Sequence, residues 1–283
     1  MFLTLILLEK DGKRYNKNMK TAVVLAKNEE KSIKTCLLSL KGFEEIIVID
    51  DNSSDKTREI AKKLGVRVYK RKLNNDFSNQ RNFGLKKAKG DWIFFLDADE
   101  KIDNKLKREI FKAIRDPQTN SGFSFKRKDT FLGKELKFGE TASLRLTRLG
   151  KKNSGFWTGK VHEVWKVKGK IGKLYNPIIH QRHIGVSGFI KRINFYSSLR
   201  ARELYEKGVK TNAFLIIIYP LAKFFLNFFV KLGILDGKQG FIMATLMSAH
   251  SFLVRSKLYL LWKNKGVEDP PIPPLKKLYK QYG

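Results

Sequence analysis

The sequence predicts an α/β fold, with a mostly parallel sheet covered by helices on both faces and a separate helical region after it. Three observations support this prediction. Strand and helix patterns alternate from Lys20 to about Gly122, which is typical of a parallel sheet. Two clusters of acidic residues directly follow two of the predicted strands, at the edge where such sheets bind ligands. Residues 186–263 then change to long, apolar and basic helical patterns.

The composition limits the possible classes of protein. The chain has 283 residues, 42% of them apolar, which is enough for a packed core and excludes wholesale disorder. Its formal net charge of +31 predicts an anionic partner: nucleic acid, an acidic membrane surface or a phosphorylated substrate. The charge is uneven, because residues 1–163 hold 22 of the 27 acids, whereas residues 164–283 hold five acids and 21 bases.

We expect four segments. Residues 1–18 are predicted to be a flexible or non-native extension, with Met19 as the working start. Their apolar run is too short to span a bilayer and lacks the basic start and cleavage site of a signal peptide. Residues 19–185 are predicted to form the main domain, residues 186–266 an amphipathic and apolar helical region, and residues 267–283 a Pro-rich, extended tail.

The elements of the main domain follow in order. Residues 21–26 are a continuous apolar run, as expected for a strand buried on both faces. Asn28 is expected to cap a helix over residues 29–40, whose apolar residues recur at helical spacing. Further strands are predicted at 46–50, 66–69 and 92–96, and further helices at 55–64, 77–88 and 103–115. Residues 122–185 lose the helical period and predict an antiparallel extension of the sheet.

The single cysteine, Cys36, excludes an internal disulfide bond. It lies on the apolar side of the first predicted helix. We therefore interpret it as a buried structural thiol.

The acidic clusters are the strongest candidates for chemistry. Residues 50–55 (DDNSSD) end the second predicted strand, and Asp97-Ala98-Asp99-Glu100 follows the fourth. Asp97 and Asp99 point to the same side of an extended chain, and neighbouring carboxylates repel unless a cation lies between them. Mg²⁺ is typically bound by one or two carboxylates together with substrate phosphates. The pattern therefore predicts a metal–diphosphate site.

Four motifs resemble those of glycosyltransferase family 2, in order and over about residues 19–263. They are AKNEE at 26–30, IDDNSSDKT at 49–57, FLDADE at 95–100 and GKVHE at 159–163. The branch that looks most similar contains the lipooligosaccharide and lipopolysaccharide-core β-1,4-glucosyltransferases. The resemblance implies a GT-A fold, inverting sugar transfer from a nucleotide-sugar donor such as a UDP-hexose, and Mg²⁺ or Mn²⁺ as cofactor.

The resemblance also implies roles for individual residues. Glu163 would be the catalytic base that takes the proton of the acceptor hydroxyl. Asp99 and Asp97 would hold the metal, and His180 and His183 are both candidates for a histidine ligand. The other nucleotide-sugar-binding candidates are Ala26, Asn28, Glu29, Asp51, Asn79, Arg81, Ala98, His162 and Arg145, the last because a guanidinium can pair with phosphate.

Residues 213–230 are nearly long enough to span a bilayer, which needs ~20 apolar residues. Lys207, Lys210 and Lys231 flank both ends, so the charges favour neither orientation. A helix in the plane of the cytoplasmic leaflet, with its bases against anionic headgroups, fits best. A helix packed on the protein's own core and a single span remain alternatives. We expect a cytoplasmic protein, peripheral or monotopic at the inner face of the cell membrane.

Two other functions fit parts of the sequence. A basic nucleic-acid-binding protein would explain the charge, but no zinc, helix-turn-helix or RNP signature is present, and the acidic clusters would repel phosphates. A nucleotidyltransferase usually has a Gly-rich first loop with Arg or Lys, which AKNEE is not. The expected partners are therefore a nucleotide-sugar donor, a glycan or lipid-linked acceptor of cell-envelope polysaccharide synthesis and an anionic membrane surface, with no nucleic acid.

Overall fold

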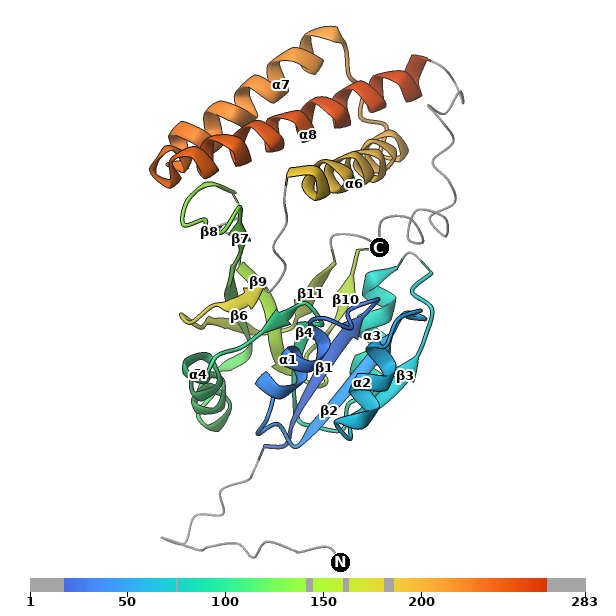
Figure 1. Ribbon diagram of the computed structural model, residues 1–283, viewed down its shortest axis with the longest axis vertical. Coiled ribbons are helices and arrows are strands. Elements are labelled where there is room, and N and C mark those ends of the chain that lie inside the picture. The colour runs from blue at the N-terminus through green and yellow to red at the C-terminus, as the bar shows by residue number, and fades with distance from the viewer. Residues whose placement is uncertain (1–17, 75, 141–144, 160–162, 181–185, 264–283) are drawn as a thin grey trace, which may run out of the picture.

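The computed structural model describes residues 18–263, except residue 75 and residues 141–144, 160–162 and 181–185. Figure 1 shows an α/β layer around a twisted sheet, with a layer of long helices beside it. The predicted alternation of strands and helices is confirmed. Its elements are β1 (Lys20–Ala26), α1 (Ile33–Ser39), β2 (Glu45–Asp50), α2 (Thr57–Lys63), β3 (Arg67–Lys70), α3 (Phe77–Lys87), β4 (Trp92–Asp97), β5 (Glu100–Lys101) and α4 (Asn104–Arg115).

The main sheet has the strand order β3-β2-β1-β4-β9-β6-β13-β5. Its first four strands run parallel. β9 (Arg145–Lys151) runs antiparallel to β4 and to β6 (Asn120–Lys128), which confirms the antiparallel extension at this point. Two small antiparallel pairs stand beside the sheet, β7 (Thr130–Phe131) with β8 (Lys134–Glu135) and β10 (Gly155–Thr158) with β11 (Val164–Val167).

The extension is not antiparallel throughout. β12 (Lys170–Lys173) and β13 (Ile178–His180) run parallel to β6, so this part of the prediction is wrong. The chain leaves the sheet after β9, because the β10–β11 pair packs on one face of it through Trp157 and Trp165. It then re-enters the sheet beside β6 in the parallel sense.

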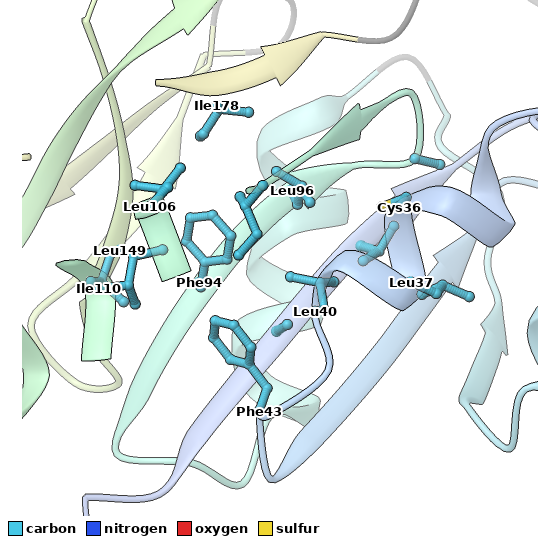
Figure 2. Packing of buried hydrophobic residues seen from close by; sticks show 14 of the residues in the cluster. Cys36, Leu37, Leu40, Phe43, Phe94, Leu96, Leu106, Ile110, Leu149 and Ile178 are labelled. Carbon is cyan, nitrogen blue, oxygen red and sulfur yellow. The ribbon is translucent and has the colours of Figure 1, made fainter. Parts of the chain in front are cut away.

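Alternate residues of the central strands face opposite sides of the sheet. Ala22 and Val24 of β1 face a core that includes residues of α1, α2 and α4, whereas Val23 faces α3 and the β10–β11 pair. Figure 2 shows the first core, where Phe94 of β4 stacks on Phe43 with ring centroids 5.8 Å apart. The prediction of helices on both faces is confirmed, and this packing fixes the carboxyl ends of β1, β2 and β4 beside one another.

Cys36 lies within this first core (Figure 2). Its Sγ is 3.6 Å from the carbonyl oxygen of Asp97. Burial is the main cause that raises the pKa of the thiol, and nearby carboxylates add to it. The prediction of a buried structural thiol is confirmed.

α1 begins later than predicted, and Asn28 does not cap it. Asn28 has a left-handed φ of 52°, and side chains that follow β2 bind the backbone of its loop. Ser53 Oγ accepts from the N–H of Asn28 at 3.0 Å, and Thr57 Oγ1 accepts from the N–H of Glu29 at 2.7 Å. These tertiary hydrogen bonds take the place of a helical first turn.

The helical layer consists of α6 (Val186–Glu206), α7 (Ala213–Phe225), a π-helical turn η1 (Leu226–Val230), a 3₁₀ turn η2 (Gly233–Asp236) and α8 (Lys238–Lys263). α6 and α7 both pack along α8 (Figure 1), so the predicted helical patterns are confirmed. The layer is joined to the segment after β8. The buried carboxylate of Asp236 accepts the N–H groups of Lys137 and Phe138, and Lys223 pairs with Glu140 at 2.7 Å.

Candidate functional site

The first loop and the segment after β2 form one hydrogen-bonded unit at the carboxyl edge of the sheet. The carbonyl oxygen of Ala26 accepts from the N–H of Asp51 at 2.9 Å, and Asn28 Oδ1 accepts from the N–H of Ser54 at 2.9 Å. Glu29 joins the unit through its backbone N–H. The structure therefore brings together four of the predicted binding residues, although each is also used to hold the loops.

Asp51 and Asn79 both bind the loop after β3. Asp51 Oδ1 accepts from the N–H of Leu73 at 2.8 Å, and its Oδ2 is 3.5 Å from Lys27 Nζ. Arg71 donates to Asn79 Oδ1 at 3.0 Å. These contacts hold the loop after β3 against the end of β2 and the start of α3.

Asp97 lies at the end of β4 between two buried arginines. Arg81 of α3 donates to its Oδ1 at 2.9 Å, and Arg148 of β9 donates to its Oδ2 at 3.0 Å. The same Arg81 is 2.8 Å from Glu163 Oε1, and its guanidinium lies 4.8 Å from the ring centroid of Trp157. Burial opposes ionisation of Asp97, but the charges of Arg148 and Arg81 outweigh it and lower the pKa of this carboxyl well below its usual value. One charge network thus links α3, β4, β9 and the segment before β11.

A second network lies beside the first. His180, at the end of β13, has its Nε2 3.1 Å from Asp99 Oδ2 and its Nδ1 2.8 Å from Asp129 Oδ1. Burial works against the charged imidazole, but the hydrogen bonds with Asp129 and Asp99 raise the pKa of His180 to about 9. Arg127 Nε in turn pairs with Asp129 at 3.1 Å. Next to Asp99, burial and then the charge of Asp97 raise the pKa of the Glu100 carboxyl to about 7.

The second network fits a divalent cation better than the first. A histidine that binds a metal through one ring nitrogen usually gives its other N–H to a carboxylate, and Asp129 is placed to accept it. Asp99 and His180 would be the protein ligands once the cation displaces the Nε2 proton of the imidazole, which leaves other positions for phosphate oxygens. Each carboxylate oxygen of Asp97 already accepts a hydrogen bond from an arginine, Arg81 or Arg148, so Asp97 is less available to a cation than Asp99 is. Within the described residues no group of three or more His, Cys, Asp or Glu residues forms a metal cluster.

Two predicted residues, Arg145 and Ala98, stand apart from these networks in the contacts that the structure gives. Arg145 donates to the carbonyl oxygens of Ser124 and Leu174 at 2.7 and 2.6 Å, so its guanidinium ties β9 to its neighbours. His162 and His183 lie outside the described residues. Ala98 is buried, and its N–H donates to the carbonyl oxygen of Leu25 at 2.9 Å, which fixes the turn between Asp97 and Asp99.

Sequence reasoning missed three members of the networks: Arg148, Asp129 and Arg127. The signal for Arg148 was an arginine in the middle of a strand, between a threonine and a fully buried leucine. The signal for Asp129 was an acid at the end of a strand, as for Asp97. Neither points to a partner, because the partners lie 51 residues away along the chain in both cases.

Comparison with known proteins identifies the family. The family model "Glycosyl transferase family 2" matches residues 21–166. The lipopolysaccharide core biosynthesis glycosyltransferase LpsC of Rhizobium meliloti is 26% identical over 248 residues, which cover 84% of this chain and 91% of that protein. An uncharacterized glycosyltransferase of Rickettsia felis is 26% identical over 261 residues, covering 87% and 92%.

Solved structures of glycosyltransferases also resemble this chain at low identity. Glucosyl-3-phosphoglycerate synthase from Mycobacterium tuberculosis, in complex with Mn²⁺ and UDP-glucose, is 15% identical with a TM-score of 0.47, covering 69% of this chain and 81% of that one. TarS of S. aureus, in complex with UDP, is 17% identical with a TM-score of 0.43, covering 93% and 90%.

Proposed function

Because the chain belongs to glycosyltransferase family 2, and is a glycosyltransferase of GT-A fold, we propose that it transfers a sugar, with inversion, from a nucleotide sugar to a glycan or lipid-linked acceptor. The donor in this proposal is a UDP-hexose. The acceptor belongs to cell-envelope polysaccharide synthesis of the lipopolysaccharide type, which the name of the Rhizobium meliloti relative supports. The observation that carries the proposal is the Asp99–His180 pair beside the Asp97–Arg81–Glu163 network, at the ligand-binding edge of the sheet.

The residues divide the work between donor and acceptor. Asp99 and His180 would hold Mg²⁺ or Mn²⁺, which supplies positive charge to the departing diphosphate when bound. Asp129 holds the imidazole of His180 in its orientation through Nδ1, the ring nitrogen that does not face Asp99. Asp51 and the loop of Asn28 border the nucleotide in this proposal, because they form the neighbouring part of the same edge.

Glu163 is the proposed base. It takes the proton from the acceptor hydroxyl as that oxygen attacks the anomeric carbon and the bond to the diphosphate breaks. The carboxylate of Glu163 is largely buried, and Arg81 holds it 2.8 Å away while binding Asp97 with the same guanidinium. A planar guanidinium can hold two carboxylates in a fixed relation, so Arg81 positions the base relative to the end of β4.

The proposal includes a location. With a nucleotide-sugar donor and a membrane-linked acceptor, the protein would work in the cytoplasm, peripheral or monotopic at the inner face of the cell membrane. Its partner there would be an anionic membrane surface rather than nucleic acid. The uneven charge supports this location, because the bases without neighbouring acids gather in the C-terminal part of the chain.

Label tracing tests the proposal and separates it from nucleotidyl transfer. The protein is incubated with UDP-hexoses labelled either in the sugar or in the uridine, with Mn²⁺ and a truncated lipopolysaccharide acceptor. We expect the sugar label in the acceptor, the uridine label in free UDP, and no transfer by Asp99→Asn or without a divalent metal. Uridine label in the product, or full activity of Asp99→Asn, would overturn the assignment.

A further inference from the structure

One side of α7 is apolar and has no protein partner in the described part of the chain. Phe214, Ile217, Leu221 and Phe225 recur at helical spacing, and each is more than half exposed. None of the α7 residues is buried. By length and composition residues 213–230 could cross a membrane.

Exposed apolar residues continue beyond α7, through the two turns that join α7 to α8. The exposed residues lie in η1, between η1 and η2, in η2 and in the first turn of α8: Val230, Leu232, Ile234, Leu235 and Phe241. We call these residues, with the four of α7 and with Ile218 and Phe229, the apolar surface. A continuous exposed surface of this kind marks an interaction site.

The opposite side of α7 is fixed to the rest of the protein. Lys223 pairs with Glu140 at 2.7 Å, and Asn227 Oδ1 accepts from the N–H of Glu140 at 3.1 Å. Ser248 of α8 donates to the carbonyl oxygen of Pro220 at 2.8 Å. A helix that crossed a bilayer would have to give up these contacts and carry Lys223 into the hydrocarbon, so the geometry disfavours a single span.

The charges around the apolar surface are positive. From Lys207 to Lys263 the only acid in the sequence is Asp236, which is buried against backbone N–H groups. Lys210 and Lys238 lie exposed near the two ends of the surface. A second copy of the chain would bring like charges together, whereas anionic lipid headgroups complement them.

We propose that the apolar surface inserts into one leaflet of an anionic phospholipid membrane, with α7 lying in the membrane plane. Figure 1 shows the carboxyl ends of β1 and β4 directed toward the helical layer. The segment after β8, which α7 and η2 hold, follows Asp129 closely in the chain. The inserted surface therefore keeps the site beside the leaflet, and the acceptor that it selects is lipid-linked. This last step, the class of acceptor, rests on the proposed function.

Vesicle sedimentation without donor or acceptor tests the insertion itself. Wild-type protein is expected to bind vesicles of phosphatidylcholine and phosphatidylglycerol more tightly than vesicles of phosphatidylcholine alone. Ile217→Glu is expected to lower the affinity ~10- to 100-fold, because burial of one such side chain contributes about 1.5–3 kcal/mol. Leu38→Glu, at an exposed apolar residue of α1, is the matched control and should bind like wild type.

The same variants decide between the possible occupants. Equal vesicle binding by Ile217→Glu and wild type would overturn the proposal. So would a concentration-dependent dimer that Ile217→Glu abolishes, because the occupant would then be a second copy. Circular dichroism checks that the variant is folded, and Leu221→Glu is a second variant on the same surface.

A sidedness assay tests the in-plane arrangement. Single cysteines replace Lys210 or Lys238 in vesicle-bound protein, and a membrane-impermeant maleimide is added outside. Both should react if α7 lies in the plane, and only one if it spans; the buried Cys36 gives little background. Protein that binds vesicles but transfers no sugar would contradict the proposed function and leave the insertion intact. Preference for a soluble acceptor over a lipid-linked one would overturn the acceptor class.

Discussion

Removal of the Asp129 carboxylate is expected to weaken metal binding without unfolding the protein. In the structure Asp129 Oδ1 lies 2.8 Å from His180 Nδ1, and the other ring nitrogen of His180 faces Asp99. Loss of a carboxylate that orients a metal-binding histidine typically lowers metal affinity about 10- to 100-fold, or about 1.4–2.8 kcal/mol. Asp129→Ala should show a loss of this size.

The assay is titration of the protein with Mn²⁺ in the presence of UDP, with free Mn²⁺ measured by electron paramagnetic resonance. Asp129→Asn keeps an oxygen that can accept from the imidazole, so its affinity should lie between those of wild type and Asp129→Ala. Asp116→Ala removes an exposed acid at the end of α4 and serves as the control. Unchanged Mn²⁺ affinity in folded Asp129→Ala would refute the role of Asp129 and weaken that of His180.

Three further changes test other parts of the structure. Arg81→Lys replaces the guanidinium that binds both Asp97 and Glu163 by a single ammonium group. In steady-state kinetics, kcat should therefore fall by about 10²-fold while donor affinity changes little. An unchanged kcat would contradict the positioning role of Arg81. Asp236→Ala leaves the N–H groups of Lys137 and Phe138 without their acceptor and should lower the free energy of unfolding by about 1–3 kcal/mol in urea titration, which an unchanged midpoint would contradict. Gly155→Ala would place a Cβ against the carbonyl oxygen of Lys166 across the β10–β11 pair and should destabilise the protein by about 1–3 kcal/mol, which a thermal melt equal to wild type would contradict.

The central part of the fold could be predicted because its signals are local. Buried parallel strands are continuous apolar runs, and β1, β2 and β4 all match the predicted ranges to within one or two residues. The acids directly follow β2 and β4 in the chain, so their position at the carboxyl edge of the sheet could be predicted as well. By contrast, the parallel return of β12 and β13 depends on where the β10–β11 pair packs, and no short stretch of sequence determines that.

The site was predicted in part. Asp97, Asp99, Arg81, Glu163 and His180 do lie in two adjoining networks, but their partners Arg148 and Asp129 were not foreseen. β9 carries Arg148 to Asp97 only because that strand inserts between β4 and β6. At Asn28 the local signal for a helix cap was misleading, because the residue forms hydrogen bonds with the segment after β2 instead of capping α1.

The most direct measurement of the central claim separates binding from chemistry at Glu163. Mn²⁺–UDP affinity and the rate of sugar transfer are determined for wild type and Glu163→Gln. If Glu163 is the base at this edge of the sheet, the variant should bind Mn²⁺ and UDP like wild type and transfer sugar about 10²- to 10⁴-fold more slowly. Transfer by Glu163→Gln at the rate of wild type would contradict the account.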